Sequence, residues 1–476
     1  MVAPAWKTLA YACTLLVTAA IAYFLLHVPF QVGDNLDPLL QLEGESTWHL
    51  FSSNLVSAGF LRPLTLVTSK LVFETARLSG GHYFLVYRSV HILLVILLLT
   101  VTVKLLRVNS FLTFALAMLA VAVVIGLHPF HEAVHETELN IKLIMVTACM
   151  ISVVVAASPQ RWWSDAAAVT LAGYAMFANE LGLLVWVCLV TGYLVGFRGV
   201  SVRALAIITA VLGVYFYLRF VKLDVGAPGL TERSSGYGFS TRDPQELIAM
   251  FGAHPLPYYA YNVVASALTV LMSEPRGGVF MFARDLVTDR PTIGMFVNVI
   301  SSSLTTIVIV WYAARRCGAW IKGELTHDDR LFIVAAAVIA ANAAISFPYA
   351  KDVTMSPAAA FYPLAMFAAM RGLLADRTNR RTPIWGGVVV YALVAAISVG
   401  WTIRAFSLYV DMRRAAYKAQ SDWVTVSEWL VEQHIDLPTP SQRQLVEQMR
   451  TEMLGMTVPK VYLEPKWLGS ALDPLH

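Results

Sequence analysis

Long apolar stretches separated by short polar segments recur along almost the whole chain, and their length decides the class of structure. A helix needs about 20 mostly apolar residues to cross a bilayer. Nine stretches come near that length: 8–28, 83–103, 111–127, 139–157, 203–221, 292–313, 330–348, 355–370 and 384–402. A longer stretch, 166–196, is interrupted by Asn179 and Glu180, which predicts two short spans that meet at the outer surface. The pattern therefore predicts an all-α polytopic membrane protein with about eleven transmembrane helices.

The composition agrees with this class. Of 476 residues, 57% are hydrophobic and 14% are charged, and the mean hydropathy is +0.63, whereas about a quarter of the residues in a soluble domain are charged. The formal charge of +4 is too small for this length to indicate a nucleic-acid-binding protein. The four cysteines have no paired spacing and predict neither a disulfide framework nor a metal cluster: Cys13, Cys149, Cys188 and Cys317.

Lysine and arginine in the connecting segments predict the orientation, because positively charged loops stay on the cytoplasmic side. Basic residues follow every second span, whereas segment 128–138 has none. We therefore expect a multi-pass protein of a bacterial inner membrane, with a cytoplasmic N-terminus and a periplasmic or extracellular C-terminus. Segment 258–272 is also apolar, but counting it as a span would invert all later loops. It is interpreted as an interfacial or re-entrant helix.

The remaining polar regions complete the domain plan. Residues 1–402 are expected to form the transmembrane domain, with large outer loops at 29–80 and 222–291. The spacing of apolar residues in 29–80 predicts helices that lie in the plane of the membrane interface. The tail, 403–476, is rich in charged residues and predicts an extracytoplasmic helical tail. Its expected helices are 404–434 and 440–454, separated at Pro438 and Pro440.

Candidate chemistry begins just after the first span, at Asp34 and Asp37. A carboxylate at a membrane surface can act as a general base toward an acceptor hydroxyl. Asp and Asn are also favoured as helix caps and in turns, so both interpretations stay open.

The segment 128–138 concentrates three histidines and three glutamates beside two apolar stretches. His131 and His135 are four residues apart and share one face of a helix. The order of the histidines and Glu132 departs from the H-E-x-x-H zinc motif. Contact with a substrate or phosphate, a metal site and a solvated surface are the three interpretations.

Glu180 interrupts an apolar run, and an ionisable group at membrane depth indicates function unless a short loop brings it to the surface. Arg219 stands at the outer end of the seventh span, where it either snorkels to headgroups or binds a phosphate. Other polar residues share this predicted face: Arg62, Arg88, His128, Tyr349, Lys351 and Asp352. Because the predicted topology places all of them on one side of the membrane, we expect one extracytoplasmic polar site.

These motifs, taken in order, resemble those of the membrane O-mannosyltransferases of the TMTC type and their bacterial relatives in the GT-C superfamily of glycosyltransferases. The resemblance covers roughly residues 30–220, and its most specific motif is His-Pro-x-His-Glu-Ala-Val at 128–134. The other matching motifs are Asp34, Arg62-Pro63-Leu64, Tyr83 to His91, Asn179-Glu180-Leu181-Gly182 and Arg219.

The resemblance implies a GT-C-like fold and transfer of a sugar from a polyprenyl-phosphate donor on the outer face. It implies that Asp34 is the catalytic base, alone or helped by Asp37, and that Arg219 and Lys351 hold the lipid phosphate. No cofactor is required, and a divalent metal is left open. The residues expected to shape the donor site are Arg62, His128, His131, Glu132 and Glu180.

The chain departs from the family pattern in three respects. Asn35 stands where the family loop has a second acid, Asn179 stands where a lysine is expected, and no tetratricopeptide repeats follow the membrane domain. The acceptor is therefore open between a protein, a glycan and a lipid.

Two other functions stay open. One is a flippase or other transporter of lipid-linked sugars, although transporters place their sites near the midplane. The other is an O-antigen polymerase or ligase with a diphosphate-linked donor, for which the arginines of 222–291 would be suited.

Overall fold

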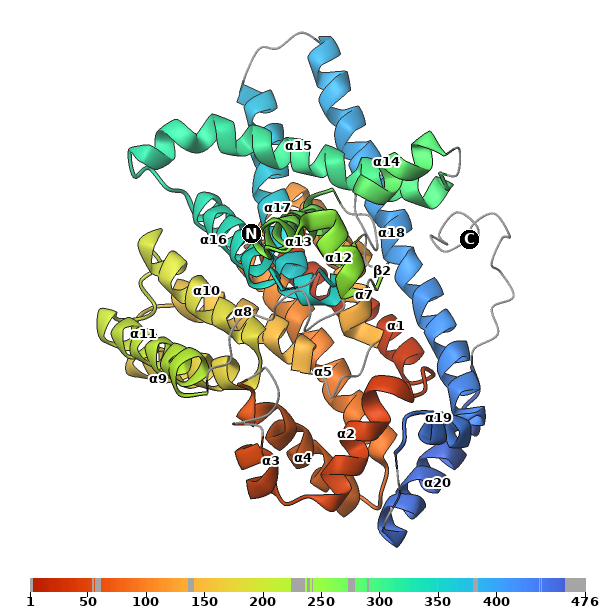
Figure 1. The fold of residues 1–476 in the computed structure, drawn as a ribbon. Coiled ribbons are helices and arrows are strands. Elements are labelled where there is room, and N and C mark those ends of the chain that lie inside the picture. Colours follow the sequence, from red (N-terminus) through yellow and green to blue (C-terminus); the bar gives the residue numbers. More distant parts are fainter. Residues whose placement is uncertain are drawn as a thin grey trace.

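The chain is built almost entirely of helices (Figure 1). The computed structural model describes residues 3–53, 55, 61–135, 141–223, 236–237, 240–241, 243–272, 279–288, 291–348, 350–379, 384–435, 437 and 439–458. Within these residues the extended structure is a short antiparallel pair, β1 (Gly236–Tyr237) and β2 (Ser240–Thr241).

A helix stands at every position where the sequence predicts a span. These helices are α1 (Ala3–Leu25), α5 (Tyr83–Leu105), α6 (Phe111–Gly126), α8 (Ile141–Ala157), α9 (Trp162–Ala178), α10 (Leu183–Leu194), α11 (Val202–Phe216), α15 (Ile293–Ile321), α16 (His327–Ile345), α17 (Ser356–Asn379) and α18 (Ile384–Val424). In the described part of the chain, 6 helical segments are long and apolar enough to cross a membrane. The chain is thus consistent with a multi-pass membrane protein, and eleven crossings stay a prediction.

The other helices connect these segments. They are α2 (Gly33–Gly44), α3 (Thr47–Ser53), α4 (Pro63–Leu78), α7 (His128–His135), η2 (Glu180–Gly182), η3 (Tyr217–Lys222), α12 (Pro244–Phe251), α13 (Leu256–Leu271), α14 (Val279–Val287), η4 (Asp352–Met355), α19 (Val426–Glu432) and α20 (Pro440–Leu454).

The predicted interruption of 166–196 is present. Asn179 has an extended backbone, and its side-chain oxygen accepts a hydrogen bond from the amide of Leu181 at 3.0 Å. This cap ends α9 and begins η2, because a short polar side chain can replace the helical hydrogen bond that is lost there.

The last span does not end near residue 402. Residues 403–424 contain neither Gly nor Pro, so nothing in the sequence stops the helix, and α18 continues to Val424. The expected helix 404–434 is therefore replaced by the end of α18 and the short α19. The second tail helix is confirmed at Pro440–Leu454, where Thr439 and Gln442 form a capping box.

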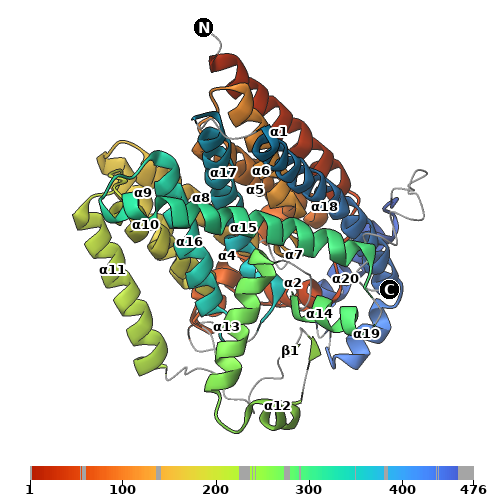
Figure 2. The ribbon, with the colours of Figure 1, turned by 90° about the horizontal axis from the view of Figure 1, so that it is seen from above.

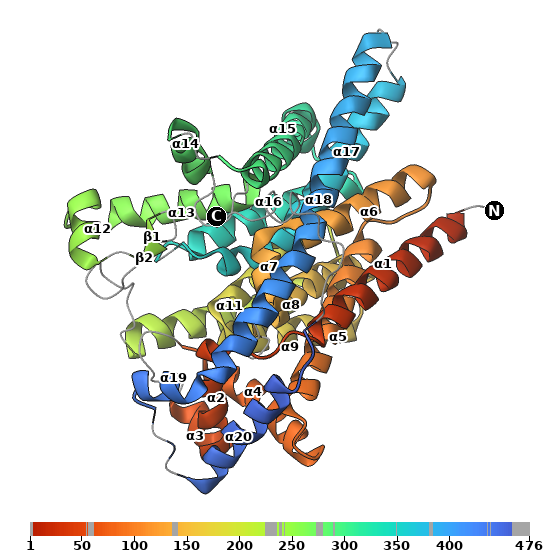
Figure 3. The ribbon, with the colours of Figure 1, turned by 90° about the vertical axis from the view of Figure 1, so that its right-hand side faces the viewer.

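The first loop and the tail share a hydrophobic core that is separate from the core of the main bundle. Trp423 donates its indole N–H to the carbonyl of Phe30 at 2.6 Å, and Gln442 donates to the carbonyl of Leu40 at 3.2 Å. Figure 3 shows α19 and α20 against α2, α3 and α4. The two regions, separate in the sequence, form one helical unit.

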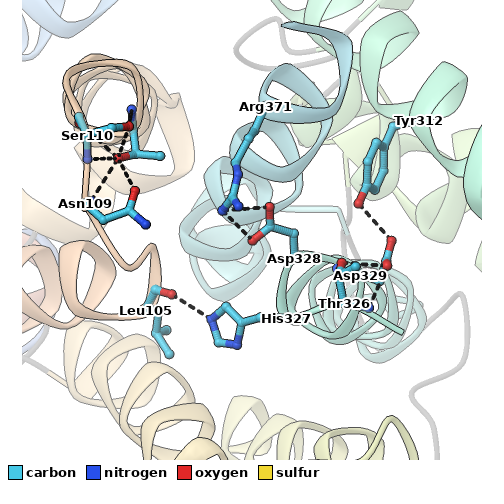
Figure 4. A network of polar contacts seen from close by, with 10 residues as sticks. Leu105, Asn109, Ser110, Tyr312, Thr326, His327, Asp328, Asp329 and Arg371 are labelled. Atoms are coloured by element: carbon cyan, nitrogen blue, oxygen red, sulfur yellow. Dashed lines mark hydrogen bonds and ion pairs between the residues drawn. The ribbon is translucent and has the colours of Figure 1, made fainter. Parts of the chain in front are cut away.

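Contacts between helix ends fall into two sets, one at each end of the bundle. At one end, His327 bonds the carbonyl of Leu105 at 3.1 Å and Arg330 donates to the carbonyl of Gly196 at 3.1 Å (Figure 4 shows the first contact). They join the ends of α5 and α10 to the start of α16. At the other end, the first loop meets η2, and α7 meets η4 and α18.

The helix expected at 258–272 is α13, which lies with α12 on the side of the bundle away from α1 (Figure 2). Asn262 donates to the carbonyl of Phe347 at 2.9 Å, and the hydroxyl of Thr306 donates to the carbonyl of Leu271. Thus α13 packs between the end of α16 and the middle of α15. Its interfacial or re-entrant position in a membrane stays a prediction.

Candidate functional site

Three of the predicted site residues meet in one ion cluster. Glu180 Oε2 lies 2.6 Å from both Nε and Nη2 of Arg62, and Oε1 lies 3.3 Å from Nη1 of Arg219. Nη1 of Arg219 also donates to the hydroxyl of Tyr215 at 2.8 Å. The cluster brings together residues that are up to 157 positions apart in the sequence (219 − 62).

Local structure holds each member in place. Arg62 immediately precedes α4, whose first residue is Pro63, and the hydroxyl of Thr65 donates to the carbonyl of Ala178 at the end of α9. Glu180 begins η2 two residues after Ala178. The contact of Thr65 with Ala178 therefore brings the start of α4 beside η2. Arg219 lies in η3, a π-helical turn that continues α11. Such turns are rare and frequently mark functional sites.

Among the described residues of the cluster, one carboxylate faces two guanidinium groups. The side chains of Glu180 and Arg219 are 13% and 14% exposed, and that of Arg62 is 32% exposed. Nε of Arg219 is buried and has no hydrogen-bond partner among the described residues. A partly enclosed pair of guanidinium groups with a spare donor on Arg219 is suited to an anion.

Exposed apolar side chains lie on the same turns of helix as Arg219. Those exposed along the end of α11 and η3 are Phe216, Tyr217, Phe220 and Val221. The guanidinium of Arg219 also lies over the ring of Phe220, 5.5 Å from its centroid. An anion that binds here would therefore have an apolar surface beside it.

Histidines of α7 pair with carboxylates from two other elements. His128 Nδ1 lies 2.7 Å from Oδ2 of Asp352 in η4, and His131 Nδ1 lies 2.7 Å from Oδ2 of Asp411 in α18. The second ring nitrogen of His131 contacts the carbonyl of Ile125. Burial lowers the pKa of His131, and the carboxylate of Asp411 opposes that shift.

The two histidines differ in how far their side chains are exposed. His131 is 2% exposed and both of its ring nitrogens contact protein acceptors, so it connects α7 to α18, and its predicted contact with substrate stays a prediction. The side chain of His128 is 21% exposed, against a buried Asp352. His128 therefore stays a candidate for substrate contact.

The remaining predicted residues are placed by their elements. Asp34 lies in the first turn of α2, and Asp37, one turn further, is exposed. Lys351 directly precedes η4 and is half-buried. The side chains of Asp34, Glu132 and His135, together with Tyr349, lie outside the described residues. Among the residues that the structure describes, no three His, Cys, Asp or Glu side chains are arranged to hold a metal ion.

The sequence analysis missed Asp411, which it assigned only to the charged tail. Asp411 belongs to the extension of α18 past residue 402, and a continuous helix without a Gly or Pro breaker was the signal that could have placed it.

Comparisons with protein-family models, curated proteins and solved structures found no match to this chain.

Proposed function

We propose that the protein is an integral membrane glycosyltransferase that moves a hexosyl or pentosyl group from a polyprenyl-phosphate donor to an acceptor on the extracytoplasmic face. The observation that carries this proposal is the Arg62–Glu180–Arg219 cluster. It offers positive charge and a spare buried donor beside an exposed apolar helix end. A lipid phosphate is the ligand that combines an anionic group with an apolar chain.

The resemblance of the motifs to the GT-C superfamily supports the same class of donor. In the proposed reaction, Asp34 accepts the proton of the acceptor hydroxyl while its oxygen attacks the anomeric carbon. The bond from that carbon to the phosphate oxygen breaks on the opposite face, so the configuration inverts. Phosphate is a good leaving group, and the arginines offset the charge that grows on it. Asp37 is placed one turn from Asp34 to assist.

The arrangement of helix ends supports the predicted topology. The loop after α1 packs against the tail after α18, so an even number of crossings must separate them. Ten helices from α5 to α18 fulfil this condition when α13 is not a crossing, which agrees with the eleven predicted spans, and the predicted cytoplasmic N-terminus then puts the first loop and the tail outside. The cluster and the pairs of α7 then share the extracytoplasmic face.

The test is sugar transfer in vesicles that contain the purified protein, a labelled polyprenyl-phosphate sugar and a membrane extract with protein, glycan and lipid acceptors. Asp34→Asn is expected to lower kcat at least ~100-fold with KM nearly unchanged, because a general base acts in the transition state. Arg219→Gln is expected to raise KM for the donor and lower kcat/KM, because it removes a phosphate contact.

Arg203→Gln is the matched control, since Arg203 is an exposed arginine at the opposite end of the same α11. It is expected to leave transfer unchanged. Absence of transfer by the wild type, with movement of the labelled lipid between leaflets, would overturn the proposal in favour of a flippase. Equal transfer by wild type and Asp34→Asn would remove Asp34 as the base.

A further inference from the structure

Two arginines are enclosed by the fold, and their hydrogen bonding differs. Arg88 in α5 is 0% exposed and Arg404 in α18 is 2% exposed. Arg404 donates from Nε to the carbonyl of Gly126 at 3.1 Å, and from Nη1 to the hydroxyls of Ser301 and Ser302 at 3.1 and 2.6 Å. Arg404 is therefore supplied with protein acceptors.

Arg88 has far fewer partners. Its Nη2 donates to the carbonyl of Val28 at 2.7 Å, whereas Nε and Nη1 are buried without an acceptor among the described residues. The rings of Phe30 and Phe84 face the guanidinium, with centroids 5.8 and 5.6 Å away. The described residues that enclose Arg88 thus supply a single hydrogen bond and no carboxylate.

Such burial is unfavourable for the protein alone. A charged group removed from water must recover its hydration through hydrogen bonds or a counter-charge, and an unpaired donor leaves that cost in place. An anion that reaches Arg88 gains charge-assisted hydrogen bonds to a guanidinium that is already desolvated. This preorganisation favours binding.

We propose that Arg88 is a second anion-binding residue, which binds a phosphate group through Nε and Nη1. Phe30 lies in the connection from α1 to α2, four residues before Asp34. The aromatic rings cover the guanidinium, so binding requires one of them to move. The phosphate comes either from a lipid headgroup or from free phosphate, and the inference does not depend on sugar transfer.

The test measures thermal unfolding of the full-length protein in a neutral detergent, without ligand, with inorganic phosphate, and with an alkyl phosphate. All variants carry Arg219→Gln, which weakens the other proposed anion site. In the Arg219→Gln protein with Arg88 unchanged, ligand at a concentration about 100-fold above Kd should raise the Tm by roughly 2 °C or more. Adding Arg88→Met should abolish the rise.

Arg404→Met is the matched control. Without ligand, Arg88→Met is expected to keep the Tm or raise it, whereas Arg404→Met should lower it by several degrees, because it removes the donor to four acceptors, those of Gly126, Asn298, Ser301 and Ser302. Stabilisation by both ligands identifies a phosphate group as sufficient, and stabilisation by the alkyl phosphate alone identifies a lipid headgroup.

Three results would overturn the inference. They are no stabilisation by either ligand, equal stabilisation with and without Arg88→Met, and a loss of Tm from Arg88→Met as large as that from Arg404→Met. If Arg88→Met does not fold, Arg88→Lys replaces it, and direct binding of labelled alkyl phosphate is measured. The lysine keeps the charge but has fewer donors, so Kd should rise about tenfold or more; an unchanged Kd would contradict the inference.

Discussion

Asp329 at the start of α16 is the buried carboxylate with the largest set of hydrogen bonds in the described part of the fold, and replacing it by Asn removes part of that set. Its Oδ1 accepts from Tyr312 at 2.8 Å, from Trp320 at 2.8 Å and from Nε of Arg316 at 3.0 Å (Figure 4 shows the first). Its Oδ2 accepts from Nη2 of Arg316 at 2.7 Å and from the amide and hydroxyl of Thr326 at 2.9 and 2.6 Å.

An asparagine presents one acceptor oxygen and one NH₂ group. The NH₂ group would face three donors, and because the one hydroxyl among them (Tyr312 or Thr326) can turn to accept, two of the six contacts become donor facing donor. Asp329 is 0% exposed, and each lost hydrogen bond costs about 1 kcal/mol or more, higher where Arg316 is the donor. Loss of a buried partner of an ion pair costs about 3–5 kcal/mol as a whole. We therefore expect Asp329→Asn to lower the free energy of unfolding by about 3–5 kcal/mol.

The pH dependence gives a second measurement of the same group. Burial alone would raise the pKa of Asp329, but hydrogen bonds from Arg316, Thr326 and Trp320 lower it well below its usual value. A carboxylate with a depressed pKa contributes stability above its unfolded pKa of about 4 and loses it as the pH falls through the folded value. The variant should therefore lose less stability on acidification below pH ~4 than the wild type.

The assay is equilibrium unfolding in mixed detergent micelles, followed by far-UV circular dichroism. Asp376→Asn is the control: Asp376 pairs with Arg315 at 3.2 Å with both side chains partly exposed, so the change should stay within about 1 kcal/mol. The reasoning is refuted if Asp329→Asn costs no more than Asp376→Asn.

Three further perturbations test other parts of the fold. Burial lowers the pKa of His327 in the folded protein. Below the unfolded pKa of about 6.5 the unfolded chain therefore binds a proton more readily than the folded protein, and the free energy of unfolding falls as the pH drops. His327→Gln removes this titration and should reduce the loss of Tm between pH ~7 and ~5. A Cβ on Gly182 would overlap the carbonyl oxygen of Ala175. Gly182→Ala should therefore lower the free energy of unfolding by about 1–3 kcal/mol in the same assay. Gly173 has open space around it, so Gly173→Ala is the control and should not lower it. Trp423→Phe should lower the free energy of unfolding by about 1 kcal/mol, because one hydrogen bond is lost. Trp423→Ala should lower it by about 3–5 kcal/mol, because it opens a cavity in the core between the first loop and the tail. Equal effects of the two variants would contradict the packing of Trp423 in that core.

The positions of the helices could be predicted from the sequence because they depend on local pattern. An apolar stretch of given length and a polar cap such as Asn179 are both visible in a short window of sequence. The end of α18 was mispredicted for a local reason as well. The change in composition near residue 402 predicts a boundary, but residues 403–424 contain no Gly or Pro to end the helix, and α18 continues to Val424.

The contacts within the candidate site required three dimensions. The topology predicted that Arg62, Glu180 and Arg219 share a face, but a shared face does not determine which charges touch. The pairing of His131 with Asp411 spans 280 positions, and no period or spacing carries such information. The enclosure of Arg88 could not be predicted either, because it depends on how the first loop folds back over α5.

The segment 28–32 connects these findings, because three separate helices hold it just before Asp34. Arg88 of α5 donates to the carbonyl of Val28, and Trp423 of α18 donates to the carbonyl of Phe30. The amide of Phe30 in turn contacts the sulfur of Met453 in α20 at 3.3 Å. In the proposed reaction, Asp34 in the first turn of α2 must be held in position to act as a base, and the helices that hold the segment before it come from both ends of the described chain. The proposed reaction therefore implies that the tail affects transfer, even though none of its described residues belongs to the ion cluster. A phosphate bound at Arg88 would act on the same segment.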